Sequence, residues 1–193
     1  MNGELTGKVA LVTGSSKGIG RAIALGFAEA GASVCLVART DAELDTVIAA
    51  AHEGSRLIAV KADVTEQDSL QFAFARCAES FGGLDILVIN AGISNEPRTV
   101  ENSDPVRWRQ TLETTLFGAY LTAKTAIPHL RQRGGGNIIV LGSGMGHRGM
   151  KGSSAYSCSK AGLSMLVRVL AEELRKHGIS VNELIPGPVD TGL

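Results

Sequence analysis

The chain has 193 residues, enough for one domain with a substantial buried core. Its 19 basic and 19 acidic side chains cancel, so we expect neither a nucleic acid nor an anionic membrane as a partner. The three cysteines, Cys35, Cys77 and Cys158, are widely spaced in no metal-binding pattern, so we expect reduced thiols in a cytoplasmic protein. Residues 1–8 lack the features of a signal peptide, and no apolar run is long enough to span a bilayer.

Short β-branched runs alternate with longer helical patterns, which predicts βα units around a parallel sheet. We expect strands at 9–12, 33–39, 56–62, 84–89, 137–141 and 180–185. We expect helices at 18–30, from 40 onward, at 65–81, 104–133 and 154–177. Thr40 with Glu43 resembles a capping box, and Thr65 with Asp68 marks the next helix start. The expected fold class is α/β: a Rossmann-type doubly wound parallel sheet in three layers, with one domain over residues 1–193.

A glycine-rich turn, Thr13-Gly14-Ser15-Ser16-Lys17-Gly18-Ile19-Gly20, lies between the first strand and the first helix. Glycine removes the Cβ that would keep a phosphate away from the backbone, and a helix N-terminus offers unpaired N–H groups. The Gly-x-x-x-Gly-x-Gly spacing is longer than the common dinucleotide fingerprint. We expect a pyrophosphate at Gly14, Ser16, Lys17, Gly18, Ile19 and Gly20; the alternative is a glycine-rich turn without a ligand.

The end of the second strand bears on the choice of nucleotide. NAD binders usually place an acidic residue there, about twenty residues after the glycines, to hold the ribose 2′-OH. This chain has Ala38 and Arg39 instead, with Lys17 in the glycine loop. Two cations favour a 2′-phosphate, so the expected cofactor is NADP(H), with NAD(H) as the alternative. The structural alternative is that Lys17 and Arg39 are solvated surface charges without a ligand. Asp41 lies close but suits the first turn of the next helix.

Tyr156 and Lys160 form a third candidate site. Residues four apart share one helix face, so both side chains point the same way. A cation beside a phenol favours the phenolate, which suits a general acid or base. The spacing alone is common on helix surfaces, so the interpretation depends on companion motifs.

Those companions are present in order along the chain. The glycine loop, Asn90-Ala91-Gly92, Ser143, Tyr156-x-x-x-Lys160 and Pro186-Gly187 together resemble the short-chain dehydrogenase/reductase family, and within it the 3-oxoacyl-ACP reductases. The resemblance runs from about Gly7 to Thr191. It implies reversible hydride transfer between a nicotinamide and the carbon of a ketone or secondary alcohol, a small-molecule substrate.

The resemblance also implies residue roles. Tyr156 would exchange a proton with the substrate oxygen, Lys160 would bind the nicotinamide ribose and favour the phenolate, and Ser143 would hydrogen-bond the substrate oxygen. Further cofactor contacts are implied at Asp63 and Val64 beside the adenine, at Asn90, Ala91 and Gly92 beside its ribose, and at Pro186, Gly187, Val189 and Thr191 beside the nicotinamide.

Other expectations concern neighbouring residues and assembly. The helix from Asp104 and the Tyr156 helix would pack against their copies in a homodimer or homotetramer. Cys158 is expected to face away from the catalytic pair and to serve packing. His147 and Arg148 could reach a substrate, although surface loop residues are the favoured interpretation.

The sequence departs from the family pattern in three places. Thr115 replaces an asparagine that commonly holds a water in a proton relay, so we expect reduced rather than absent activity. Ile89 replaces an asparagine before Asn90, and Leu193 follows the sixth strand without the usual substrate lid and last strand. The main alternative is therefore a nucleotide-binding protein with weak or no turnover, acting as a binding or scaffold subunit. A weaker alternative is a structural subunit that uses its sixth strand as a contact.

Overall fold

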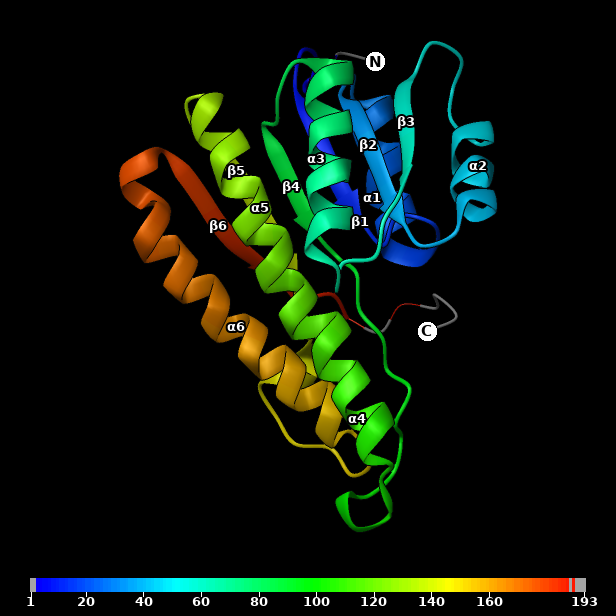
Figure 1. Cartoon of the computed structure of the whole chain (residues 1–193), viewed down its shortest axis with the longest axis vertical. Helices are drawn as coiled ribbons and strands as arrows, with labels where there is room; N and C mark the ends of the chain where they lie inside the picture. The colour runs from blue at the N-terminus through cyan, green and yellow to red at the C-terminus, as the bar shows by residue number, and fades with distance from the viewer. Residues whose placement is uncertain (1–2, 188, 190–193) are drawn as a thin grey trace.

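The computed structural model describes residues 3–187 and 189, in which six parallel strands form one sheet flanked by helices (Figure 1). The strands are β1 (Val9–Thr13), β2 (Ser33–Ala38), β3 (Arg56–Lys61), β4 (Ile86–Ile89), β5 (Gly136–Leu141) and β6 (Ile179–Leu184). Their order is β3-β2-β1-β4-β5-β6. The chain moves outward from β1 to β3 and then returns to β4 on the other side. A crevice therefore opens at the carboxyl ends of β1 and β4, where such sheets bind ligands.

Helices cover both faces of the sheet. On one face, α1 (Gly18–Glu29) and α2 (Asp41–Ala49) pack on one cluster of buried apolar residues. On the other, α3 (Gln67–Phe81), α5 (Gly118–Gln132) and α6 (Ser154–Leu174) pack on a second cluster. Strand β1 serves both, because Val9 and Leu11 point to one face and Ala10 and Val12 to the other. The predicted three-layer, doubly wound α/β fold is confirmed.

The predicted helix over 104–133 is interrupted. Asp104 caps α4 (Pro105–Leu112) by accepting a 2.8 Å hydrogen bond from the Val106 N–H. A π-helical turn, η2 (Glu113–Phe117), then separates α4 from α5. Such turns are frequent at functional sites, and this one contains Thr115. Short 3₁₀ turns complete the chain: η1 (Val100–Asn102), η3 (Gly144–Gly146) and η4 (Arg175–His177).

The predicted helix starts were partly wrong. Thr40 is the N-cap residue of α2, but its side chain makes no capping hydrogen bond, so no capping box forms. Helix α3 begins after Glu66, because the Thr65 hydroxyl donates a 2.8 Å hydrogen bond to Asp63 Oδ1 instead of opening the helix. Gly178 ends the last helical segment, since it adopts a left-handed φ of 68° after η4.

Strand β6 is an edge of the described sheet. Ile179 and Val181 point toward α6 and are buried, whereas Asn182 and Leu184 on the opposite face are exposed. None of the helices within residues 3–187 has both the length and the apolarity that a membrane crossing requires.

Candidate active site

The glycine loop at the start of α1 has the shape that a phosphate needs. Gly14 has a φ of +64°, and a Cβ there would lie 2.9 Å from the Ala91 Cα atom. A Cβ at Gly20 would collide with the carbonyl oxygen of Gly14. No side chain caps α1 at Lys17, so the N–H groups of its first turn are available to an anion.

Hydrogen bonds from β2 and from the residue that follows β4 hold this loop in place. The Asn90 amide donates 3.0 Å hydrogen bonds to the carbonyl oxygens of Thr13 and Gly14. On the other side, the Val37 N–H donates a 2.9 Å hydrogen bond to Ser15 Oγ. The sequence predicted Asn90 as a cofactor contact, and the structure adds that its amide braces the glycine loop.

A pocket of about 250 Å³ opens beside the loop, at the switch point of the sheet. Ten of its lining residues were among the predicted cofactor contacts: Gly14, Ser16, Lys17, Gly18, Ile19, Arg39, Val64, Asn90, Ala91 and Gly92. The other residues that line the pocket were not predicted as cofactor contacts: Ala38, Thr40, Glu43, Ala62, Ile93 and Thr114. Several of these follow strand ends, so the rule for parallel sheets could have found them. Glycines without Cβ atoms, small alanine side chains and two cations fit a phosphorylated nucleotide.

Gly20 and Asp63 are among the predicted cofactor contacts that do not line this pocket. Gly20 is buried where α1 crosses the loop, and it permits that close packing. The Asp63 carboxylate is held in a local turn, where its Oδ1 atom accepts a 2.9 Å hydrogen bond from the Thr65 N–H.

Three of the predicted catalytic residues, Ser143, Tyr156 and Lys160, belong to two segments that touch, and the fourth, Thr115, lies in η2. Ser143 follows β5 and caps η3, and its Oγ atom accepts a 3.2 Å hydrogen bond from the Met145 N–H. The η3 turn packs on α6 so closely that a Cβ at Gly146 would lie 2.8 Å from the Lys160 carbonyl carbon. On α6, the Lys160 Nζ atom lies 5.6 Å from the centre of the Tyr156 ring.

Lys160 occupies an unusual environment for a lysine. Its side chain is buried, with 5% of the residue exposed, and its Nζ atom donates a 2.5 Å hydrogen bond to the Leu141 carbonyl oxygen. Burial lowers the pKa of Lys160 from 10.5 to about 8, while the carboxylate of Glu183 acts in the opposite direction. The lysine can therefore change charge close to neutral pH.

Thr115 lies in the π-helical turn and is fully buried. Its Oγ1 atom accepts a 3.2 Å hydrogen bond from the Ile93 N–H, so it holds the loop that follows β4. Its neighbour Thr114 lines the pocket instead. Trp108, on α4, donates a 3.1 Å hydrogen bond through Nε1 to Ser154 Oγ at the start of α6, and so connects the two helices.

The remaining predictions have mixed outcomes. Pro186 and Gly187 follow β6 within three residues of its last residue, Leu184, so they come after its carboxyl end. Val189 is 55% exposed, and Thr191 lies outside the described residues. Cys158 is exposed, so its expected packing role was wrong.

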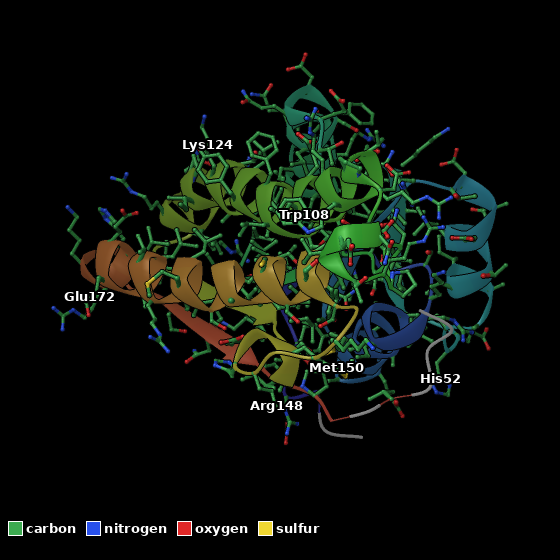
Figure 2. All side chains as sticks on the ribbon, turned by 90° about the horizontal axis from the view of Figure 1, so that it is seen from below. His52, Trp108, Lys124, Arg148, Met150 and Glu172 are labelled. Carbon is green, nitrogen blue, oxygen red and sulfur yellow. The ribbon has the colours of Figure 1, made fainter. Side chains whose placement is uncertain are left out.

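The loop residues before Tyr156 behave differently from each other. Arg148 is exposed and points outward in Figure 2, which fits a surface loop residue. The side chain of His147 is 43% exposed, yet its Nε2 atom lies 3.4 Å from Ser164 Oγ on α6. Sequence reasoning gave no sign of that contact, because Ser164 and His147 come together only in the fold.

The fold and the glycine loop define a Rossmann-type α/β protein. Residues 8–193 match the family model described as short chain dehydrogenase. The cis-4-hydroxycyclohexanecarboxylate dehydrogenase of Sinomonas cyclohexanicum is 39% identical over 96% of this chain and 75% of its own length. The 3beta-hydroxysteroid dehydrogenase of Mediterraneibacter gnavus is 35% identical, over 99% of this chain and 69% of its own.

Solved structures agree. A short-chain type dehydrogenase/reductase from Mycobacterium marinum has a TM-score of 0.93 and 36% identity, covering 99% of this chain and 76% of that one. The 7 alpha-hydroxysteroid dehydrogenase complexed with NADH and 7-oxo glycochenodeoxycholic acid also has a TM-score of 0.93, at 31% identity, covering 99% of this chain and 74% of that one. The chain belongs to the short-chain dehydrogenase/reductase family and is an oxidoreductase; members of this family use NAD(H) or NADP(H).

Proposed function

We propose that residues 1–193 form one dinucleotide-binding domain that transfers a hydride reversibly between NADP(H) and a ketone or secondary alcohol. The observation that carries this proposal is the buried Lys160 ammonium beside the Tyr156 ring, on a helix that packs against the Ser143 turn. The nicotinamide, when bound, supplies or accepts the hydride. The residues of the chain bind, orient and move protons around that transfer.

Tyr156 is the proposed general acid and base, because its hydroxyl can exchange a proton with the substrate oxygen. Lys160 stabilises negative charge on the phenol and holds the ribose hydroxyls of the nicotinamide. Ser143 offers a hydroxyl to the same substrate oxygen; its Oγ atom accepts a hydrogen bond from Met145 and keeps its own proton to donate. In this proposal Tyr156 transfers the proton, while Lys160 and Ser143 orient the cofactor and the substrate.

The preference for NADP(H) is supported by charges in the pocket lining. Lys17 and Arg39 both line it, and no carboxylate ends β2. Glu43 also lines the pocket, in the first turn of α2, and opposes a 2′-phosphate. Arg39→Asp should raise the Kd for NADPH by about tenfold or more with little effect on NADH. Glu43→Gln should lower the Kd for NADPH, and a wild-type preference for NADH would contradict this assignment.

A secondary alcohol on a carbon ring is the substrate class we propose. Both curated relatives described above, and a (-)-trans-carveol dehydrogenase of Rhodococcus erythropolis that is 38% identical over 97% of this chain, are named for dehydrogenation of ring compounds. A panel of cyclic ketones, open-chain ketones and β-ketoacyl thioesters with NADPH tests this class. Faster turnover of the open-chain compounds would contradict it.

Tyr156→Phe tests the mechanism. The variant lacks the hydroxyl alone, so nucleotide binding should persist while turnover falls by a factor of about 100 or more. Unchanged turnover in this variant would remove Tyr156 from the mechanism.

A second candidate function is nucleotide binding without turnover. The observation that favours it is Thr115, whose hydroxyl holds the Ile93 backbone. This candidate predicts NADPH binding, seen as a change in nucleotide fluorescence, without NADPH oxidation by any ketone of the panel.

The proposed assembly is a homodimer or homotetramer. Apolar side chains are exposed along η2 and α5, at Phe117 and Tyr120, and along α6, at Met165 and Val169. Light scattering on the purified protein measures the assembly, and a monomer at all concentrations would contradict this part of the proposal.

A further inference from the structure

A set of three polar side chains lies next to Lys160, and the proposed mechanism does not use it. The set, called the Glu183 cluster below, consists of His147 after η3, Ser164 on α6 and Glu183 on β6. Ser164 donates a 2.7 Å hydrogen bond through Oγ to Glu183 Oε1. The His147 Nε2 atom lies 3.4 Å from Ser164 Oγ and 3.9 Å from Glu183 Oε2. The cluster therefore joins the Ser143 turn, the catalytic helix and the edge strand.

The backbone makes room for the Glu183 carboxylate beside the catalytic serine. Strand pairing aligns Glu183 with Val140 on β5, and its side chain extends over Gly142. Any Cβ at Gly142 would collide with Glu183 Oε1, so only glycine fits this position with the carboxylate in place. Gly142 directly precedes Ser143 in the chain. The carboxylate therefore lies directly against the backbone at the end of β5.

Ser164 links the carboxylate to Lys160. It lies four residues after Lys160, on the same face of α6, and its Oγ atom lies 3.3 Å from the Lys160 carbonyl oxygen. The side chain of Glu183 is 14% exposed, so water screens its charge only weakly. A carboxylate held in this way can act on the lysine through space.

Two opposing effects act on the charge of Lys160. Burial disfavours the ammonium and lowers the pKa of Lys160 to about 8, whereas the Glu183 carboxylate raises it. The groups that face Lys160 and Glu183 are Tyr156 and Ser164 from α6, His147 from the loop, and the Leu141 carbonyl from β5. Among the described residues, Glu183 is the charged side chain whose field changes the pKa of Lys160.

We propose that Glu183, held by Ser164 beside the catalytic helix, is a positioning residue that favours the charged form of Lys160. The inference rests on the proposed function, in which Lys160 assists Tyr156. Glu183 acts through Lys160 and has no assigned contact with substrate or cofactor. An ammonium can stabilise a phenolate and donate hydrogen bonds to ribose hydroxyls. A neutral amine has no charge with which to stabilise the phenolate.

Glu183→Gln is the central variant, because glutamine keeps the size of the side chain and an oxygen that can accept from Ser164. It removes only the charge. The matched control is Glu172→Gln, which makes the same charge change on α6, where the glutamate side chain is 78% exposed (Figure 2). Ser164→Ala makes the complementary change, since it keeps the carboxylate and removes its hydrogen bond.

The direct measurement is a titration of the Lys160 ammonium by NMR in protein labelled with ¹⁵N-lysine. The Lys160 signal is assigned by its loss in Lys160→Met, so the measurement needs no turnover. We expect a lower pKa for Lys160 in Glu183→Gln and an unchanged one in Glu172→Gln. Ser164→Ala should also lower the pKa of Lys160, by a smaller amount, because the released carboxylate can turn toward solvent.

Turnover supplies an independent second measurement. Activity that needs the ammonium is lost above the pKa of Lys160, so the alkaline limb of kcat should move to lower pH in Glu183→Gln. At acidic pH, where Lys160 is charged in both proteins, kcat should return toward the wild-type value. A lost packing contact alone would lower kcat equally at every pH.

The outcomes separate this proposal from the proposed function. An unchanged Lys160 pKa in Glu183→Gln overturns the inference, whatever the activity does. A lowered pKa with an unmoved pH profile of kcat upholds the effect of Glu183 on Lys160 and contradicts the catalytic role of the lysine. If Glu183→Gln does not fold, the Ser164→Ala titration decides, and a wild-type pKa there contradicts the inference.

Discussion

Burial of Lys160 should lower the free energy of unfolding, and the size of this loss should depend on pH. Burial moves the pKa of Lys160 from 10.5 to about 8. One pKa unit corresponds to about 1.4 kcal/mol, so the buried ammonium costs about 3 kcal/mol of stability when the pH is well below 8. Between pH 8 and 10.5 the unfolded chain binds more protons than the folded one, and the stability from this group therefore rises with pH.

Lys160→Met removes this effect and keeps an unbranched side chain. It also removes the hydrogen bond to the Leu141 carbonyl oxygen, which is worth about 1 kcal/mol. At pH 7 the variant should be more stable than wild type by about 2 kcal/mol. At pH 10 the wild type has regained about 2 to 3 kcal/mol relative to the variant, so this advantage disappears.

Urea unfolding of both proteins at pH 7 and pH 10 measures the difference, with equal m-values as the sign of comparable transitions. Other groups titrate in this range as well. The pKa of Cys35 is raised by its hydrogen bond to Cys77 and by burial, so its contribution to stability falls as pH rises. That term is common to both proteins and cancels in the comparison. If wild type and Lys160→Met show the same dependence on pH, the desolvation argument for Lys160 is refuted.

Three further predictions concern the pocket and its supports. Gly20→Ala should cost about 1 to 3 kcal/mol and weaken NADPH binding, because its Cβ meets the Gly14 carbonyl oxygen. Asn90→Ala removes two hydrogen bonds to the glycine loop, so the Kd for NADPH should rise and stability should fall by about 1 to 3 kcal/mol. Thr115→Val keeps the shape but not the hydroxyl that holds the loop after β4, so stability should fall by about 1 kcal/mol.

Controls for these variants are available in the same elements. Gly26→Ala, also in α1, places its Cβ in open space and should stabilise the protein by up to about 1 kcal/mol. Equal effects of the Gly20 and Gly26 substitutions would contradict the role of close packing at Gly20. Thr115→Ser should retain the hydrogen bond and is the control for Thr115→Val. For Asn90→Ala, titrations followed by nucleotide fluorescence measure the Kd for NADPH. An unchanged Kd for NADPH would mean that Asn90 does not set the loop geometry.

Local patterns in the sequence were enough to predict the sheet and the glycine loop. A parallel strand buried on both faces appears as an apolar run, and a helix appears as a longer period, so the alternation itself predicts the doubly wound fold. The spacing of Tyr156 and Lys160 needs only helix geometry. Helix starts were less predictable, because Thr40 and Thr65 were judged by type and their hydroxyls make no capping bond.

Only the tertiary structure decided features that depend on distant residues. In the π-helical turn, Thr115 Oγ1 accepts a hydrogen bond from the distant Ile93 N–H, and the residue types at 113–117 do not indicate this turn. The pKa of Lys160 depends on burial and on Glu183, which comes from another strand. The sequence by itself therefore determined which groups stand at the strand ends, since periodicity and turn residues are local. Their charges and partners were decided by packing, because desolvation and hydrogen bonding arise between segments that only the fold brings together.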